Sequence, residues 1–249
     1  MQNMPPSDYN EGWNFKWDDM KKYGPFSRHL RRILKNMIRP LNFESVLDVG
    51  CGQGSFLQEL QAEFPNVRPY GIDISSVAIE LARKRVPRGR FCVLDISGSS
   101  LDEKSDLVVC SEVLEHISDD VQALHNLKKM TRKYLLVSTP QGRMREFEKE
   151  VGHVRNYAPG ELVNKIELSG FTVLSVTEWG FPFYSPLYRN FLDFTGSKGT
   201  SGEFGPMRKF LARLIYALFL LNSSSRGDEI FVLAEVKVDS PLRSPEISQ

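Results

Sequence analysis

The feature that most constrains the fold of this chain is a glycine-rich turn within residues 46–57, which read VLDVGCGQGSFL. An apolar segment typical of a strand leads into Gly50, Gly52 and Gly54, and a segment with a helical pattern follows. Glycine has no Cβ, so the backbone of such a turn can approach a ligand closely, and the start of the helix offers unpaired N–H groups. The turn therefore predicts a cofactor-binding strand-turn-helix unit, with a tight turn that holds no ligand as the alternative.

Polar side chains mark the ends of the strand-like segments around and after this turn. Asp48 comes just before the glycines and favours a ligand with a cationic or hydroxyl-rich part over a pyrophosphate. Asp73 lies nineteen residues after the last glycine, where a carboxylate can accept hydrogen bonds from both hydroxyls of a ribose. Asp95 ends the next strand and is placed to accept a hydrogen bond from an exocyclic amine, and Ser111 ends the fourth.

Strand-like and helical segments alternate from residue 45 to residue 139, which is typical of an α/β fold with a parallel sheet covered on both faces. Strands are expected at 46–49, 68–73, 90–95, 106–111, 134–139, 171–177 and 229–236. Helices are expected after the glycine turn, after Asp73, over about 117–131 and from about 159 to 170. The polar tail at 240–249, which contains Pro241 and Pro245, is expected to be disordered.

Taken in order, these motifs resemble those of class I S-adenosylmethionine-dependent methyltransferases over about residues 44–180. The resemblance implies a Rossmann-like, seven-stranded, mostly parallel sheet in the order 3-2-1-4-5-7-6, with strand 7 antiparallel and helices on both faces. It implies that the glycine turn holds the methionine part of the cofactor, together with Asp48 and near Ser111. Asp73 would hold the ribose and Asp95 the adenine amine, with Ile74 and Ile96 on the ring faces. The implied set of residues from the turn is Asp48, Gly50, Cys51, Gly52 and Gly54.

The spacing of the glycines separates this cofactor from a nicotinamide. The third glycine comes one residue too early for the G-x-G-x-x-G pattern of dinucleotide-binding folds. A nicotinamide-dependent enzyme is therefore the less favoured alternative, and a thermal shift with NAD(H) would support it.

Composition limits the classes of function. With 249 residues, 41% of them hydrophobic, the chain can bury one sizeable core, and a formal net charge of +1 gives no general attraction to nucleic acid. Cys51, Cys92 and Cys110 show no C-x-x-C spacing, which is typical of a reducing, cytoplasmic setting. No signal-peptide pattern is visible at the N-terminus.

Residues 1–43 precede the methyltransferase-like domain, which we expect at 44–239, and form an extension rich in aromatic and basic residues. The segment from Ser27 to Ile38 has apolar residues on one helical stripe. It is either a helix packed on the sheet edge with a solvated basic face, or part of a lid over the cofactor. As a lid, it would bring Arg28 or Arg32 to the methionine carboxylate in a bidentate pair, and we expect Arg32 among the cofactor-binding residues.

Residues 180–228 form a long insert before the last strand, and long inserts in small domains usually carry function. Its stretch 207–221 is apolar but includes Arg208, Lys209 and Arg213, and it is too short and too charged to span a bilayer. The stretch can pack on the sheet, roof the substrate pocket, or lie along a membrane surface as a peripheral contact. Each arrangement indicates a substrate, the acceptor of the methyl group, with a hydrophobic part.

The run SEVLEH at 111–116 carries the candidate catalytic chemistry. On a helix, Glu112, Glu115 and His116 would share one face, and with His153 they could hold a divalent cation such as Mg²⁺. A metal-free site with His116 or His153 as the catalytic base is the alternative. So is a purely structural role, in which the acids complement a helix start.

An E-x-x-E-H motif with a distant histidine resembles two groups of methyltransferases, those of ubiquinone biosynthesis and those that methylate the terminal ribose of small RNAs. The resemblance implies a metal that binds substrate hydroxyls. Near-neutral charge and the apolar insert disfavour a polynucleotide, so we expect O-methylation of a small or lipid-like acceptor. A metal-independent N- or C-methyltransferase of a natural-product or glycan pathway and a non-catalytic cofactor-binding module stay open, as does the oligomeric state.

Overall fold

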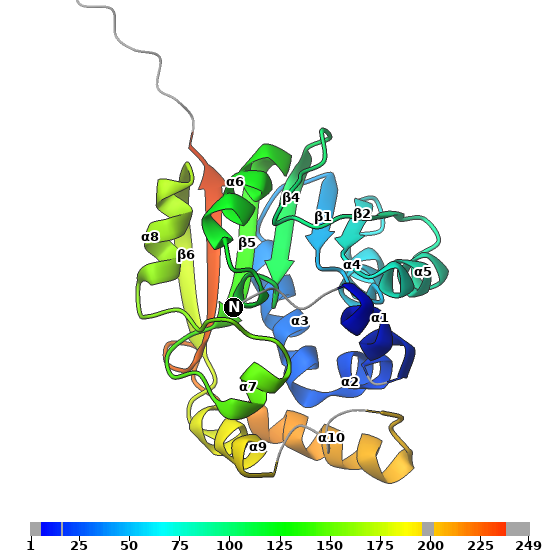
Figure 1. The fold of residues 1–249 in the computed structure, drawn as a ribbon, viewed down its shortest axis with the longest axis vertical. Coiled ribbons are helices and arrows are strands. Elements are labelled where there is room, and N and C mark those ends of the chain that lie inside the picture. The colour runs from blue at the N-terminus through cyan, green and yellow to red at the C-terminus, as the bar shows by residue number, and fades with distance from the viewer. Residues whose placement is uncertain (1–5, 16, 196–201, 238–249) are drawn as a thin grey trace, which may run out of the picture.

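The computed structural model describes residues 6–15, 17–195 and 202–237, and Figure 1 shows them as a sheet flanked by helices. The sheet has seven strands in the order β3-β2-β1-β4-β5-β7-β6, and β7 runs antiparallel to both of its neighbours. The strands are β1 Ser45–Val49, β2 Arg68–Asp73, β3 Arg90–Val93, β4 Ser105–Ser111, β5 Thr131–Pro140, β6 Phe171–Trp179 and β7 Glu229–Val236. The predicted fold class and strand order are confirmed.

Helices cover both faces of the sheet (Figure 1). They are α1 Pro6–Phe15, α2 Asp18–Tyr23, α3 Pro25–Ile38, α4 Ser55–Glu63, α5 Ser76–Arg85, α6 Asp120–Met130, α7 Glu146–Glu150, α8 Glu161–Leu168, α9 Arg189–Thr195 and α10 Pro206–Phe219, with a 3₁₀ turn at Leu114–His116 and an irregular helical stretch at Phe183–Tyr188. Helices α7, α9 and α10 lie beyond the carboxyl ends of the parallel strands (Figure 1). Among the described residues, no helix is both long and apolar enough to cross a membrane. The tail predicted at 240–249 lies outside the described residues.

Two apolar clusters lie on opposite faces of the sheet, as the alternation of side chains along a strand requires. In β1, Val46 belongs to the cluster that includes residues of α3, α4 and α5, whereas Leu47 belongs to the cluster that includes residues of α6 and α8. Both clusters are buried, so β1 is covered on both sides, as an interior parallel strand must be.

The insert packs against the N-terminal extension through α10 and α3, which lie side by side (Figure 1). The ring of His29 stacks on the ring of Tyr216 at 4.1 Å and on that of Trp179 at 5.1 Å, and its Nε2 contacts the Tyr216 carbonyl oxygen at 2.9 Å. The stripe predicted on α3 is buried, including Leu30 and Leu34. The two segments outside the minimal domain therefore fold as one wall.

Gly227 closes the base of the insert, where the chain returns to the sheet. Its φ is +156°, and a Cβ there would lie 2.1 Å from the carbonyl oxygen of Trp179. We expect Gly227→Ala to lower the free energy of unfolding by about 2–4 kcal/mol, because backbone atoms must move to admit the methyl group. Urea unfolding of the two proteins measures the difference.

The matched control is Gly98→Ala, because a Cβ at Gly98 meets nothing within 4 Å. It should change the free energy of unfolding by less than about 1 kcal/mol. Equal effects of the two substitutions would contradict the assignment of Gly227 as a close backbone contact.

Candidate active site

A cavity of about 490 Å³ lies at the carboxyl ends of the parallel strands, where the order of strands reverses between β1 and β4. Most residues that the sequence singled out line it. These are Asp48, Gly50, Cys51, Gly52, Asp73, Ile74, Asp95, Ile96, Ser111, Glu112, Glu115, His116 and His153. Gly54 is not among the lining residues, and it precedes α4 with a φ of 80°.

The glycine turn is fixed to the end of β2 by backbone and carboxylate hydrogen bonds. Gly50 N and Cys51 N both donate to the carbonyl oxygen of Ile72, and Gly52 N donates to Asp73 Oδ2 at 2.8 Å. A Cβ at Gly50 would lie 2.3 Å from a methyl group of Val113. The hydrogen bonds to Ile72 and Asp73 and the positive φ of the glycines therefore fix the conformation of the turn.

Two carboxylates at this turn are buried with few hydrogen-bond donors around them. Burial, and then the charge of Asp73, raises the pKa of Asp48 well above its usual range. Burial also raises the pKa of Asp73, although N–H groups of Ser75 and Gly52 donate to it. Because a ligand hydroxyl or cation would replace the lost solvation, both carboxylates fit a ribose and an ammonium or sulfonium group.

The N-terminal extension supplies aromatic side chains to the same cavity. Tyr9, Trp13 and Trp17 all line it, and a Cβ at Gly52 would lie 2.6 Å from the Trp13 ring. Asn10 accepts a hydrogen bond from the Ser75 hydroxyl at 2.6 Å, which fixes α1 to the start of α5. The extension is thus part of the cavity wall beside the glycine turn.

The structure does not bring the two predicted arginines to the cavity. The guanidinium of Arg28 lies over the Tyr216 ring at 4.0 Å, and Arg32 Nε donates to His29 Nδ1 at 3.3 Å. Both arginines lie at the contact between α3 and α10. The side of α3 that carries them therefore faces the insert and not the cavity. Lys21 of α2 lines the cavity instead, and its charge lowers the pKa of Asp73 against the larger effect of burial. Sequence reasoning missed Lys21 because α2 is too short to show a clear periodicity.

The helix expected to carry Glu112, Glu115 and His116 on one face is absent, and this prediction was wrong. Glu112 has a φ of 57°, and only 114–116 form a short 3₁₀ turn. Glu112 faces Glu229 of β7, whose pKa is raised well above its usual range by burial and then by the charge of Glu112. Glu112 is therefore not among the residues that could hold the metal with Glu115, His116 and His153.

Glu115, His116 and His153 do come together, with one candidate ligand atom from each within 4.8 Å of the others. The two imidazole rings are 4.7 Å apart and nearly perpendicular. Burial lowers the pKa of His116 to about 3 and that of His153 to about 4, so both rings are neutral near pH 7. His116 Nδ1 donates to the Gly152 carbonyl oxygen at 3.1 Å, which leaves Nε2 as the nitrogen with a lone pair.

Two atoms of this cluster fit a bound cation. Glu115 Oε2 accepts from Thr139 at 3.1 Å, but the buried Oε1 has no hydrogen-bond partner, and neither does the buried Nδ1 of His153. Such orphaned acceptors are costly unless a proton or a metal occupies them. One carboxylate and two imidazoles are a donor set that transition metals prefer.

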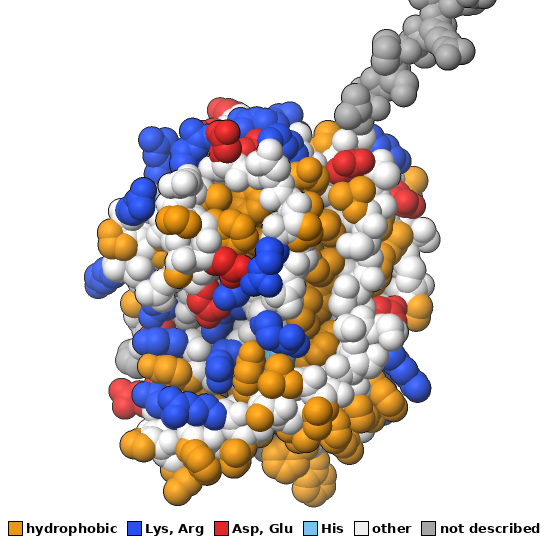
Figure 2. All heavy atoms as spheres, turned by 180° about the vertical axis from the view of Figure 1, so that it is seen from behind, with side chains coloured by type: hydrophobic (Ala, Val, Ile, Leu, Met, Phe, Trp, Pro, Cys, Tyr) orange, Lys and Arg blue, Asp and Glu red, His pale blue; other side chains and the backbone are white. Residues whose placement is uncertain are grey.

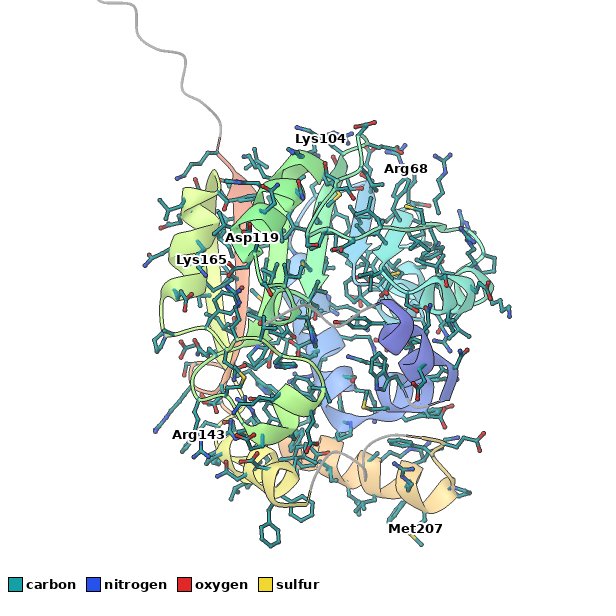
Figure 3. The ribbon with its side chains drawn as sticks, in the orientation of Figure 1. Arg68, Lys104, Asp119, Arg143, Lys165 and Met207 are labelled. Atoms are coloured by element: carbon teal, nitrogen blue, oxygen red, sulfur yellow. The ribbon has the colours of Figure 1, made fainter. Side chains whose placement is uncertain are left out.

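The loop that carries His153 is held by a buried carboxylate on α6. Asp120 accepts a hydrogen bond from Tyr157 at 2.7 Å and pairs with Arg155 at 2.8 Å and Lys165 at 2.7 Å. Figure 3 shows Lys165 on α8 among the side chains between α8 and α6. Val154 N also donates to the Glu115 carbonyl oxygen at 2.8 Å. The motif GHVRNY at 152–157 is thereby explained, since its arginine and tyrosine position its histidine.

The insert forms the rest of the cavity wall. Its lining residues are mostly apolar or aromatic, and they are Tyr184, Tyr188, Leu192, Phe204, Arg208, Leu211, Ala212 and Ile215. Arg189, which is fully buried, fixes the base of this wall by ion pairs with Glu148 and Asp228. The cavity therefore has an acidic, glycine-lined end and an apolar end.

Comparisons with known proteins agree with this geometry. A family model described as a methyltransferase domain matches residues 42–190. A malonyl-[acyl-carrier protein] O-methyltransferase of Acetivibrio thermocellus is 30% identical over 106 residues, which cover 40% of this chain and 38% of that protein. A ubiquinone biosynthesis O-methyltransferase of Hydrogenovibrio crunogenus is 25% identical over 142 residues, which cover 53% of this chain and 58% of that protein. The chain thus spans less than two thirds of these curated relatives.

A solved structure shares the fold over nearly the whole chain. The N-methyltransferase NodS from Bradyrhizobium japonicum, in complex with S-adenosyl-L-homocysteine, superposes with a TM-score of 0.61 at 18% identity. The match covers 93% of this chain and 98% of that one.

Removal of the Asp120 charge tests the anchoring of the His153 loop. Burial alone would raise the pKa of Asp120, but hydrogen bonds from Lys165 and Tyr157 and the charge of Arg155 lower it. A lowered pKa stabilises the folded state above the ordinary aspartate value of about 3.9, and this stabilisation is lost as the pH falls through the folded value. Asp120→Asn should therefore lower the free energy of unfolding by about 2 kcal/mol near pH 7, and the difference should shrink below about pH 3.9.

Urea unfolding at a series of pH values checks this, with Asp102→Asn as the control because Asp102 is exposed. The control should stay within about 0.5 kcal/mol of the unsubstituted protein. A difference for Asp120→Asn that grows on acidification would contradict the assignment.

Proposed function

The chain belongs to the methyltransferase-domain family and is an S-adenosylmethionine-dependent methyltransferase, and we propose that it methylates a hydroxyl of a small acceptor with an apolar, lipid-like part. One observation carries the proposal. A single cavity joins the glycine turn and its acids to the cluster of Glu115, His116 and His153, and then to an apolar wall. The methyl donor, the side chain that accepts the proton and a hydrophobic methyl acceptor can therefore meet in this cavity.

The residues of the turn would hold the cofactor, which when bound supplies an electrophilic methyl group on a sulfonium. Asp73 would accept hydrogen bonds from the ribose hydroxyls, and Ile74 and Ile96 would contact the adenine. Asp95 accepts a hydrogen bond from Ser97 N at 2.8 Å and lines the same part of the cavity. Lys21 is the candidate partner of the methionine carboxylate.

The histidine cluster would handle the proton of the acceptor hydroxyl. His116 Nε2 carries its lone pair near the Glu115 carboxyl group, at 3.9 Å from Oε1, and can accept a proton from a hydroxyl placed between them and the donor. Since a sulfonium methyl is intrinsically reactive, alignment and deprotonation supply most of the catalysis.

We include a divalent cation in the proposal as the alternative to deprotonation by His116, because a cation on His116 Nε2 would occupy the lone pair that otherwise accepts the proton. Glu115, His116 and His153 would hold it, and it would lower the pKa of a hydroxyl bound to it. Two imidazoles and one carboxylate suit a transition metal such as Mn²⁺ or Zn²⁺ better than the Mg²⁺ that the sequence suggested.

The remaining expectations from the sequence stand as parts of this proposal. Residues 1–43 act as an extension that covers the cofactor side, and 180–228 act as the acceptor wall of the domain at 44–239. A cytoplasmic location and the absence of a nucleic-acid partner stay predictions.

Lys21 and its neighbour Lys22 offer a matched pair of substitutions. Lys21→Gln should weaken S-adenosylhomocysteine binding by about 10- to 100-fold, because a charged hydrogen bond to the carboxylate is worth about 1.5–3 kcal/mol. Lys22 is exposed on the same short helix and does not line the cavity, so Lys22→Gln should leave the affinity unchanged. Isothermal titration calorimetry measures both, and equal affinities of the two variants would contradict the role of Lys21.

Labelling with a deuterated methyl donor in cell extract tests the reaction itself. We expect transfer of the label to an oxygen of a compound that partitions into organic solvent, located by mass spectrometry of the product. Label on nitrogen or carbon would contradict O-methylation. Cofactor binding without formation of S-adenosylhomocysteine in any extract would support a non-catalytic module.

Substitution of the histidines, combined with chelation, tests the catalytic cluster. His116→Ala and His153→Ala should each lower the turnover of the labelled acceptor by about 10²–10⁴-fold with unchanged affinity for S-adenosylhomocysteine. His125→Ala is the control, because His125 is exposed on α6. EDTA should also lower turnover, and Mn²⁺ or Zn²⁺ should restore it. Turnover that EDTA leaves unchanged would exclude the cation and assign deprotonation to a histidine alone.

A further inference from the structure

The outer side of α9 and α10 is unusually apolar for a surface. Ten of the fifteen exposed large hydrophobic side chains among the described residues lie between residues 187 and 221. We call them the apolar face, and they are Leu187, Phe191, Phe194, Met207, Phe210, Leu211, Leu214, Leu218, Leu220 and Leu221. Figure 2 shows hydrophobic side chains gathered at the end of the molecule where these helices lie.

On α10 the exposed apolar residues form one stripe. Met207, Phe210 and Leu214 are spaced by three and four residues, and Leu211 and Leu218 continue the same side of the helix. The opposite side of α10 faces inward through Ala212 and Phe219, both of which are buried. The helix therefore has two apolar sides, and packing among the residues that the structure describes explains only the inner one. Figure 3 shows Met207 at the outer edge of α10.

The charged side chains of α10 have one sign, whereas α9 carries Asp193 as well as Arg189. Residues 204–227 contain no Asp or Glu, but they contain Arg208, Lys209, Arg213 and Arg226. By helical spacing, Arg208 and Arg213 lie on the two sides of the stripe, whereas the Lys209 ammonium lies over the Tyr23 ring at 4.4 Å. A helix with an apolar stripe between basic side chains is the type that lies in the plane of an anionic membrane surface. A second copy of the chain would instead bring like charges together across the contact.

The apolar face and the cavity share a helix. Leu211 is 53% exposed on the outside and also lines the cavity, and Ile215 and Ala212 follow it on the inner side. A surface that touches α10 therefore lies next to the acceptor end of the cavity.

We propose that the apolar face of α9 and α10 docks on the surface of an anionic lipid bilayer, with α10 in the membrane plane. Arg213, which is exposed beside the stripe, contacts anionic headgroups, and the stripe of α10 enters the upper acyl region. On the basis of the proposed function, the acceptor is a membrane lipid or lipid-linked compound whose hydroxyl enters the cavity beside Leu211 while its apolar part stays in the bilayer.

Vesicle flotation of the full chain tests the docking without reference to methyl transfer. We expect the protein to float with vesicles of phosphatidylcholine and phosphatidylglycerol, and to float far less with phosphatidylcholine alone. The double variant Phe210→Glu, Leu214→Glu should lose flotation. Neither residue lines the cavity, so its affinity for S-adenosylhomocysteine should be unchanged and should report that it is folded.

Two controls separate this face from the rest of the surface. Leu168→Glu adds a charge at an apolar side chain that is 86% exposed on α8, and it should float like the unsubstituted protein. Arg213→Gln should weaken flotation on anionic vesicles, whereas Lys84→Gln on α5 should not.

Flotation that is absent on anionic vesicles, or that survives in the double variant, overturns the proposal. So does a sedimentation experiment that shows a stable dimer which the double variant dissolves, because the face is then an interface between copies. Docking without a lipid-like labelled product would leave the membrane contact established and overturn only the acceptor class.

Discussion

The reversal of strand order between β1 and β4 is the constraint on which the site depends. Strands β2 and β3 extend the sheet on one side of this point and β5 on the other, so the loops after β1 and β4 diverge and leave a space between them. The glycine turn follows β1, and the turn with Glu115 and His116 follows β4. The topology alone therefore places the glycine turn opposite the turn that carries Glu115 and His116, whatever side chains the two turns carry.

Non-local contacts then refine what the topology provides. Asp120 holds the loop of His153 in place, and the Gly152 carbonyl oxygen sets the tautomer of His116. The stacking of His29 on Tyr216 fixes the insert against the N-terminal extension. Each of these interactions joins residues far apart in the sequence, so the arrangement of the cavity walls is a property of the complete fold and not of any one motif.

The sheet, and the gathering of the glycine turn and the strand-end acids around one cavity, could be predicted because their signals are local. The alternation of apolar residues, the glycines and the acids at strand ends are all visible within short windows. Glu112 was misplaced because its N–H donates to the Ser138 carbonyl oxygen of β5, a contact that holds its backbone outside the helical region. Arg32 was misplaced because the periodicity of α3 shows that a face is buried but not which neighbour covers it. Lys21 gave no periodic signal at all.

The matched family segment, residues 42–190, leaves out the N-terminal extension on the cofactor side of the cavity and most of the insert on its apolar side. Trp13 and Lys21 precede it, whereas Phe204 and Ile215 follow it, and all four line the cavity. On the proposed function, the insert holds the acceptor, whereas the extension and the central segment hold the donor. A change of acceptor would then require substitutions in the insert and none in the sheet.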